Sequence, residues 1–576
     1  MDLPVGLLSV PEDLLVQEIL AHLGLSSLAS CMCTCRQLHA LISSSVLLNY
    51  LKELEISGMI DNSRCSRRVI SLKTRLEMLR ERELRWMNLD WKWRTGVDPP
   101  PLNAAGTGSV FDGGLMVAKL MDPRAAVTGL YTMSLPHQMD KLPRWREFDI
   151  GQPYLPGIVA VEEDLLACVT FEQCHTRNQR FNMNIHLLRY STLEPHSSAI
   201  SPILRVTAFW TDYGRPNVHI SICGDSLAFD YRYSIRSDSC LVIWNWKTGV
   251  TLGHLWKNQS LPRTGLAFLT KDLLVTVDLA KASIDVIKIP QSSESLAHKG
   301  ATGLQPFLRL KLPVLQSLSF FEYAAANISG RPRPMASDQS RNTESTRPFL
   351  HDPLSTILSI YFRVSIKSIF VPRGAPIEPY LTFYLIIHRR VLLEYILQHP
   401  ASVSSGQAQD KNAYIPEVPW EDWGIENTRM FAFEGRKDQL SNLSGTKCII
   451  TQNNNIEVLE FGRLKVAAHR AKRQNESTET KETEVRPGVK IELVDYDAPS
   501  RYPDPEHVFG EDIITCLPYI KGTYGSTGII GEPKDGLWDG TWDSVFMDES
   551  HVIGTKESKS DDGATRIQKL DMLYFG

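Results

Sequence analysis

Three cysteines near the N-terminus are the first residues whose type and spacing could do chemistry. Cys31, Cys33 and Cys35 are separated by single residues, whereas zinc sites usually keep about two to four residues between paired cysteines and add a second pair elsewhere. The surrounding apolar pattern predicts a helix, on which successive cysteines of this set point about 200° apart. We therefore interpret the three as small apolar core residues rather than metal ligands.

A thiol beside an imidazole, at Cys174 and His175, is the other candidate for catalysis. Adjacent residues in a strand point to opposite faces of a sheet, so this pair is not expected to react together. The sequence also lacks the P-loop, the HExxH zinc motif, the G-x-S-x-G nucleophile elbow and the EF-hand calcium loop. These residues therefore predict no catalytic residues, no cofactor and no metal site.

The bulk composition limits the class of protein. The chain has 576 residues, of which 43% are hydrophobic and 22% charged, and these values are typical of a folded globular protein. They exclude a collagen-like chain, a coiled coil and a largely disordered chain. The formal net charge of −4 argues against nucleic-acid binding, which needs a basic surface. Because one core stops growing at about 250–300 residues, the chain must divide or repeat.

The N-terminus and the apolar stretches indicate the compartment. Residues 1–4, MDLP, lack the basic start and the cleavage site of a signal peptide. The most apolar long stretch, residues 381–397, is interrupted by His388, Arg389 and Arg390 and does not fit a membrane-spanning helix. Ten cysteines are too sparse for a disulfide scaffold. We expect a cytoplasmic and/or nuclear protein that has no membrane partner.

The first hundred residues read as helices. Apolar residues at helical spacing predict helical structure over residues 9–42, with a stop at Gly24 and a second helix capped by Ser26. A third helical stretch is expected near residues 69–94, and its many basic side chains should form a solvated face paired with nearby glutamates. The prolines of residues 98–101 end this pattern.

From about residue 102 the pattern becomes that of β structure, with short apolar runs between Gly, Pro, Asp and Ser turns. Paired runs, such as 164–170 with 184–188, recur about every 50–60 residues, which is typical of propeller blades or a solenoid. The spacing of a leucine-rich repeat is not found in the sequence. Three polar segments are expected to be disordered surface loops, near residues 324–349, 400–413 and 467–488.

Tryptophans fit the propeller interpretation. Trp244 ends the apolar run 241–244 and is followed by Trp246 and a turn at Gly249. In a propeller blade, a tryptophan at such a position fills the wedge between neighbouring sheets. Four other clustered tryptophans are expected to be structural as well: Trp420, Trp423, Trp538 and Trp542.

Residues 10–38 carry a compound, ordered motif. It runs VPEDLLVQEILAHL, then GLSSL, then CRQL at residues 35–38. The Val-Pro start, the paired leucines, the Ile and Leu that follow, the short turn and the Cys-Arg step closely resemble an F-box. Leu38 stands where many members of that family carry Trp or Phe.

The F-box resemblance implies a protein partner. F-boxes dock on the Skp adaptor of cullin–RING ubiquitin ligases, and the rest of such chains holds a substrate. A short helix that cannot bury all its apolar side chains by itself is consistent with such docking. By position in the motif, seven residues would form the docking face or the core behind it: Pro11, Leu14, Leu15, Ile19, Leu20, Leu23 and Leu28.

The remaining chain resembles the degenerate β-propeller tails attached to F-boxes in mushroom-forming fungi. Trp244 and Asn245 stand where WD-repeat proteins have Trp-Asp. The expected fold class is α+β multidomain, with a small N-terminal helical F-box followed by a large all-β propeller-like domain of about seven blades. The expected division is an F-box at residues 1–50, a helical linker at 51–101 and a propeller-like substrate-recognition domain at 102–576.

Three functions stay open at this point. The favoured one is a non-catalytic substrate-recognition subunit of an SCF-type cullin–RING ubiquitin ligase, which binds the Skp adaptor, the cullin scaffold and an unknown protein substrate. The alternative is an F-box scaffold protein that acts outside a ubiquitin ligase. The third is an enzyme or small-ligand propeller, which needs converging acids or histidines that the sequence does not display.

Overall fold

The computed structural model describes most of the chain between Ser9 and Gly576. Residues outside this description are 1–8, 64, 67, 102–103, 112–113, 121–126, 137–142, 174–179, 210–216, 233–238, 258–262, 279–280, 291–302, 314–327, 330–346, 366–379, 400–414, 435–438, 453–454, 476–482, 487–488, 503–511, 525–541 and 560–564. Most of the expected loop at 324–349 and all of that at 400–413 lie outside the described residues, as does Trp538.

The described N-terminal part is helical, as the apolar spacing predicts. Its elements are α1 (Glu12–Leu14), the π-helical η2 (Leu15–Ile19), the 3-10 helix η3 (Leu20–His22), α2 (Leu25–Thr34), α3 (Arg36–Ser44), α4 (Val46–Ser57) and α5 (Leu72–Met87). The expected second helix is divided at Cys35, whose extended backbone ends α2 and whose thiol accepts the Leu38 N–H at 3.5 Å. Gly24, not Ser26, is the N-terminal cap of α2.

Seven four-stranded blades form the β part of the described chain. Blade one comprises β3 (Ala104–Phe111), β4 (Gly114–Leu120), β5 (Val127–Ser134) and the first half of β6 (Trp145–Ala160). Blade two comprises the second half of β6, β7 (Leu165–Gln173), β8 (Arg180–Arg189) and β9 (Ile203–Phe209). Blade three comprises β10 (Asn217–Cys223), β11 (Ser226–Arg232), β12 (Ser239–Asn245) and β13 (Val250–Lys257), and blade four comprises β14 (Arg263–Thr270), β15 (Leu273–Asp278), β16 (Ser283–Lys288) and β17 (Pro306–Lys311). All strand pairs within these blades are antiparallel.

Blades five to seven carry the insertions. Blade five comprises β18 (Ile328–Ser329), β20 (Ile357–Ser365), β21 (Tyr380–His388) and β23 (Thr428–Glu434). Blade six comprises β24 (Gln439–Ser444), β25 (Lys447–Gln452), β26 (Asn455–Glu460) and β31 (Tyr519–Tyr524), and is extended by β28 (Val489–Val494) and β27 (Thr483–Arg486). Blade seven comprises β32 (Ser544–Met547), β33 (His551–Lys559), β34 (Thr565–Tyr574) and β2 (Trp93–Val97). The smaller elements are β1 (Met59–Asp61), paired with β19 (Phe349–His351), β29 (Ser500–Tyr502), paired with β30 (Ile513–Thr515), β22 (Glu417–Val418), η4 (Val161–Glu163), α7 (Arg389–Gln398), α8 (Trp420–Asn427) and α9 (Arg463–Asn475).

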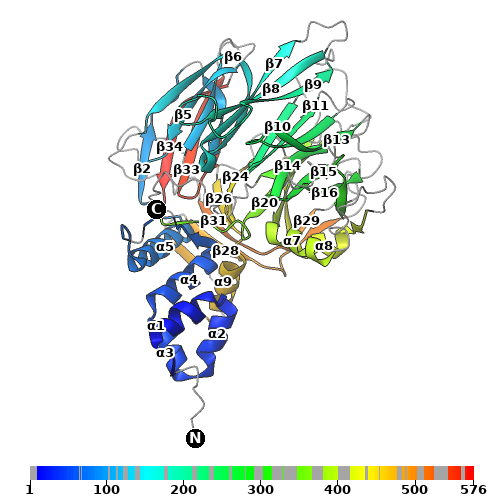
Figure 1. Cartoon of the computed structure of the whole chain (residues 1–576). Helices are drawn as coiled ribbons and strands as arrows, with labels where there is room; N and C mark the ends of the chain where they lie inside the picture. The colour runs from blue at the N-terminus through cyan, green and yellow to red at the C-terminus, as the bar shows by residue number, and fades with distance from the viewer. Residues whose placement is uncertain are drawn as a thin grey trace.

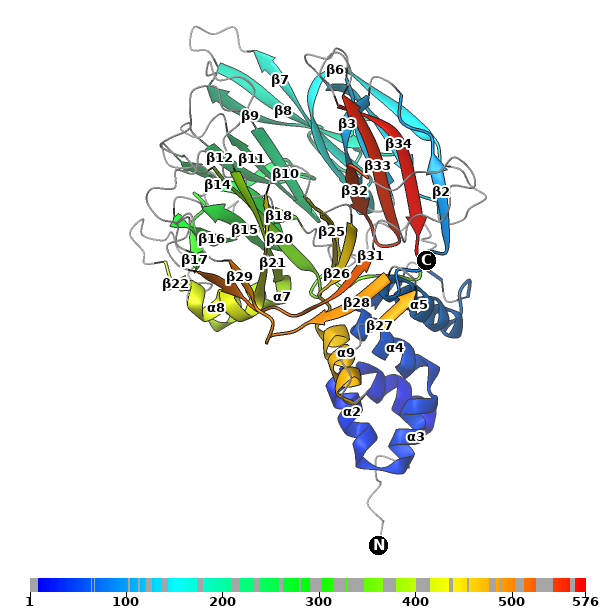
Figure 2. The ribbon, with the colours of Figure 1, turned by 180° about the vertical axis from the view of Figure 1, so that it is seen from behind.

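The ring closes between the two ends of the β region (Figure 2). β2 pairs antiparallel with the C-terminal strand β34, with Trp93 opposite Tyr574 and Val97 opposite Leu570. The propeller therefore takes its first strand from residues before the proline run, whereas the sequence pattern placed the boundary at residue 102. The prolines directly follow β2, whose pairing partner β34 is more than 470 positions away along the chain. No local sequence pattern can indicate such a pairing.

Apolar side chains fill the wedges between blades. Trp244 and Trp246 are buried in one cluster with residues of blades two and three, so the wedge role expected for Trp244 is confirmed. The Trp246 Nε1–H donates to the Gly224 carbonyl at 2.8 Å. Trp420 and Trp423 are also buried and meet edge to face at 5.3 Å between ring centroids, which agrees with their expected structural role.

The helical part is fixed to the propeller through α5 and a two-stranded sheet. β1 follows α4 and pairs with β19 of the blade-five region. Two arginines of α5, Arg75 and Arg82, are 0% and 2% exposed. The Arg75 guanidinium binds the Asp61 carboxylate at 2.6 Å, and the Arg82 Nη2 donates to the Glu549 carbonyl at 2.6 Å. The expectation that all basic residues of this helix face solvent is therefore wrong for these two arginines. Each is buried because it binds an acceptor outside α5, which is Asp61 of β1 for Arg75 and the Glu549 carbonyl of the propeller for Arg82.

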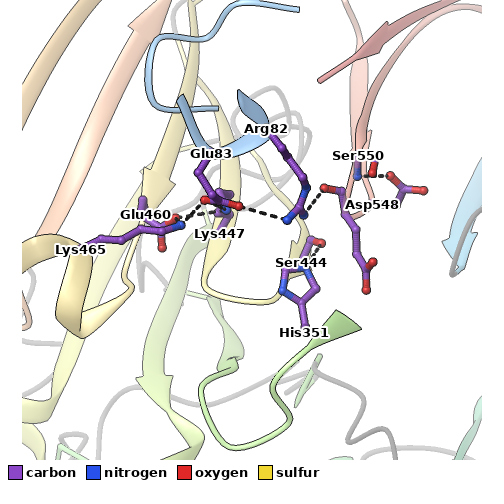
Figure 3. A network of polar contacts seen from close by, with 10 residues as sticks. Arg82, Glu83, His351, Ser444, Lys447, Glu460, Lys465, Asp548 and Ser550 are labelled. Atoms are coloured by element: carbon purple, nitrogen blue, oxygen red, sulfur yellow. Dashed lines mark hydrogen bonds and ion pairs between the residues drawn. The ribbon is translucent and has the colours of Figure 1, made fainter. Parts of the chain in front are cut away.

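A buried ion network continues this junction (Figure 3). Glu83 lies beside Arg82 and contacts Lys447 at 3.4 Å and also Lys465, and Lys465 in turn binds Glu460 at 2.9 Å. Burial by itself raises the pKa of the Glu83 carboxyl, but Lys447, Lys465 and Arg82 lower that pKa to about 2. The network joins α5, two strands of blade six and α9.

The first part of the expected loop at 467–488 is helical. Residues 463–475 form α9, with Lys465 in the ion network and Arg470 paired to the Asp495 carboxylate. Alanine, arginine and lysine are good helix formers, and these two ion pairs fix the helix to blade six. The polarity of the segment therefore reflects a helix on the surface of a junction. The loop prediction was wrong for this part and also for residues 483–486, which form β27 paired with β28.

Candidate functional site

A π-helical turn arranges the apolar residues at the start of the chain. The Leu20 N–H donates to the carbonyl oxygens of Leu15 and Val16. Residues five apart in such a turn share a face. Leu15 and Leu20 are thus both turned inward, 2% and 1% exposed.

The same turn directs Leu14 and Ile19, also five apart, to the solvent, where they are 52% and 38% exposed. A regular α-helical spacing predicts Ile19 on the same face as Leu15 and Leu20, so the π turn is a feature that the sequence pattern missed. Rare π turns of this kind occur frequently at functional sites.

The seven residues expected at the docking site therefore divide into two groups. Leu15, Leu20 and Leu28 are buried in the core of the helical part, and Leu23 is half-buried against that core. Pro11, Leu14 and Ile19 are exposed, and we call these three the outer apolar residues. The docking role of the outer apolar residues stays a prediction, whereas the other four hold the helices that present them.

The outer apolar residues have acidic neighbours. Glu12 and Asp13 occupy the first turn, where carboxylates interact favourably with the helix dipole. With Glu18 they line a cavity of about 720 Å³ that reaches α3, α4 and the start of α5. None of the residues lining this cavity is basic, so a complementary partner surface would combine apolar and basic groups.

The position of these helices leaves this site open. α1, α2 and α3 lie at the end of the helical part that is farthest from the blades, while α4, α5 and α9 lie between them and the propeller (Figure 1). Ten-residue α2 and nine-residue α3 are each too short to be stable alone, and they share one core with the π turn and α4. The site is therefore built by the helical part itself.

Residues 7–50 match the family model of the F-box domain. This segment is an F-box. It is followed by a seven-bladed β-propeller, and an F-box joined to a propeller fits a substrate-recognition adaptor in general and is typical of non-catalytic adaptors.

Solved structures similar to the chain share little sequence with it. The AfRom2 CNH domain is 10% identical, covers 75% of this chain and 98% of its own, and has a TM-score of 0.28. The C-terminal WD40 domain of Sif2 is 8% identical, and the match covers 75% of this chain and 97% of that domain with a TM-score of 0.26. A functionally unknown protein from Desulfotomaculum acetoxidans is 10% identical, and the match covers 63% of this chain and 83% of that protein with a TM-score of 0.27. No curated protein matches the chain in sequence.

Candidate chemical groups outside the F-box surface have structural explanations or lie beyond the described residues. Cys31 and Cys35 are half-buried and packed against the F-box core, as expected. Cys33 is exposed, so the expected core position was wrong for this cysteine, which lies on the opposite face of α2. Cys174 and His175 fall in a segment that is not described. Among the described residues, no group of three His, Cys, Asp or Glu side chains could hold a metal ion. None of the described helices is long and apolar enough to cross a membrane.

Proposed function

We propose that this chain is the substrate-recognition subunit of an SCF-type cullin–RING ubiquitin ligase. Its F-box would dock on the Skp adaptor, and its propeller would hold a protein substrate in the cytoplasm or nucleus. The observation that supports docking is the exposure of Pro11, Leu14 and Ile19 together on the first helical turns, on a domain whose other large apolar residues, apart from Val46, are buried or half-buried. Each large apolar side chain buried by a partner contributes roughly 1.5–3 kcal/mol.

The junction supports the second half of this proposal. Ubiquitin transfer requires a substrate to be held at a fixed place relative to the adaptor. Buried ion pairs fix α5 to blade six and α9, and a buried hydrogen bond from Arg82 to the Glu549 carbonyl fixes it to blade seven. A flexible connection would not keep this geometry. The chain is proposed to act without catalytic residues of its own.

Co-purification of the full chain with the Skp adaptor and a cullin tests the proposal. Leu14→Asp with Ile19→Asp should abolish recovery of both partners, because charges replace exposed apolar contacts while the F-box core stays intact. Leu397→Asp changes a leucine that is 77% exposed on α7 of the propeller and should leave recovery unchanged. Normal recovery with the Leu14/Ile19 double variant contradicts the docking model.

The alternative function, an F-box scaffold outside a ubiquitin ligase, makes a different prediction for the same experiment. The wild-type chain would then recover the adaptor without any cullin. Leu15 is unsuitable for this test because it is buried, and an aspartate there would disrupt the domain as well as its surface.

A further inference from the structure

A cavity of about 550 Å³ lies where the helical part meets blade six. Its lining comes from α4, α5 and α9 and from the blade-six strands β25, β26, β28 and β31. Its volume lies within the roughly 300–1,000 Å³ of sites that bind small molecules. None of the outer apolar residues lines it, so this junction cavity is separate from the proposed docking site.

One wall of the junction cavity is apolar. It is made by Trp86 and Leu89, at and just after the end of α5, and by Val458, Ile491 and Ile520 of blade six. All five side chains are buried and belong to one apolar cluster. The cavity therefore borders the apolar core of the junction, and such a wall favours an apolar occupant over water.

This apolar wall includes a strained backbone position. Leu89 has a φ of 50°, in the left-handed region that leucine rarely adopts. Its Cδ1 atom lies 3.0 Å from the place that a Cβ at position 522 would occupy, so the glycine there leaves room for the leucine. Strain of this kind persists only where the surrounding structure holds it, and it is frequent where ligands are held. The fold thus keeps Leu89 in the wall at a conformational cost.

The buried charges that line the junction cavity are paired with one another (Figure 3). Glu83 contacts Lys447 at 3.4 Å and also contacts Lys465. Glu460 contacts the same two lysines at 3.2 and 2.9 Å. Each carboxylate therefore already has two cationic partners, and a charged ligand at this side of the cavity would have to break these ion pairs.

The other charged residues of the lining lie closer to solvent. Glu53 pairs with Arg80 at 2.8 Å, and the Arg80 side chain is 53% exposed. Lys472 and Arg473, near the end of α9, are exposed and are not part of the apolar wall. Every carboxylate that lines the cavity thus has a cationic partner within the protein, which argues against a cationic ligand.

We propose that the junction cavity binds a neutral, largely apolar small molecule. The apolar wall takes the body of this ligand. The ligand carries no charge, because a charged group on the buried side would lose its hydration and disturb ion pairs that are already satisfied. Since the wall combines the end of α5 with blade six, the ligand contacts both and stabilises their junction. This inference does not depend on the proposed ubiquitin-ligase function.

Two aromatic probes that differ in one charged group test this proposal. N-phenyl-1-naphthylamine is neutral, and 8-anilinonaphthalene-1-sulfonate has the same aromatic body with a sulfonate. The full-length protein should bind one neutral probe per chain in a fluorescence titration and bind the sulfonate about tenfold more weakly. The neutral probe should also raise the melting temperature. No saturable binding of the neutral probe, or equal or tighter binding of the sulfonate, overturns the proposal.

A matched pair of variants on α9 locates the binding. Ala468→Trp fills space at an exposed position that lines the cavity, and it should weaken binding of the neutral probe by about tenfold. Ala467→Trp is the control, because Ala467 is exposed on the same helix but does not line the cavity. Undiminished binding by Ala468→Trp, or an equal loss in Ala467→Trp, overturns this location.

A second pair of variants tests the same location from α5. Leu84 lines the cavity and is 61% exposed, so Leu84→Asp should stay folded while it binds the neutral probe about tenfold more weakly. Met78→Asp changes an exposed residue of the same helix outside the cavity and should leave binding unchanged. Melting temperatures without probe check that all four variants are folded. Normal binding by Leu84→Asp, or an equal loss in Met78→Asp, contradicts the assignment.

Discussion

The F-box and its junction with the propeller are held together by opposite means. The F-box has an apolar core made from residues 10–48, all close in sequence. The junction buries Arg75, Arg82 and Glu83 against acceptors and cations, some of which are more than 360 positions away. Burying charge costs free energy unless each charge keeps its partner. The comparison indicates that the junction depends on each of its charged partners, whereas the outer apolar residues contribute little to the F-box core and are expected to tolerate change with little loss of stability.

The largest effect is expected from removing one charge of the junction. Glu83→Gln leaves Lys465 and Lys447 with one carboxylate fewer in a buried site, and breaking a buried ion pair costs about 3–5 kcal/mol. Urea unfolding of the full chain measures this loss. Glu77→Gln, at an exposed position of the same helix, should change stability by less than about 0.5 kcal/mol. Equal effects of the two variants would mean that the junction network adds no stability.

A somewhat smaller effect is expected in the F-box core. Leu20→Ala removes most of a fully buried side chain, which typically costs about 2–5 kcal/mol, with smaller costs where the surrounding core can collapse into the space. Hydrogen exchange should show faster opening of α2, α3 and α4 while the blades keep their protection. Equal loss of protection in the blades would show that the two regions unfold as one unit.

Acid should weaken the junction to a smaller degree. The pKa of Glu83 is lowered in the folded protein to about 2 from an ordinary value of 4.5. Its stabilising contribution is therefore complete above pH 4.5 and declines as the pH falls toward 2. At pH 4 the loss from this carboxyl is roughly 1 kcal/mol. Between pH 7 and pH 4, the free energy of unfolding of the wild type should therefore fall by roughly 1 kcal/mol more than that of Glu83→Gln. Urea unfolding of both proteins at the two pH values measures this difference. Equal losses in the two proteins would mean that the Glu83 carboxylate does not stabilise the folded state.

The smallest effect on stability is expected at the outer surface. Leu14→Ala shortens a side chain that is half exposed, so the free energy of unfolding should change by less than about 0.5 kcal/mol. Adaptor binding should fall by about tenfold, because a side chain at the proposed contact loses its buried area. A large loss of stability with unchanged binding would mean that Leu14 is a core residue, and would contradict its place among the outer apolar residues that the π turn exposes.

Much of the architecture was predictable because it depends on short stretches of sequence. The F-box motif lies within residues 10–38, and the change from helical to β spacing marks the propeller. The seven blades agree with the number expected from chain length. The π turn was missed because an α-helical spacing of Leu15, Val16 and Ile19 looks equally regular in the sequence. The same composition that suggested a loop at 467–488 also suits the helix α9.

The sequence by itself determined the F-box and the repeating β architecture, because helical and strand periodicities are encoded by neighbouring residues. Only the tertiary structure decided which apolar residues stay exposed and which charges are buried. Glu83 and Arg80 are similar members of one charged helix in the sequence, yet Glu83 enters a buried network and Arg80 stays exposed. The physical reason is distance along the chain: Lys465 stabilises Glu83 from 382 positions away, and such a pairing leaves no local signature.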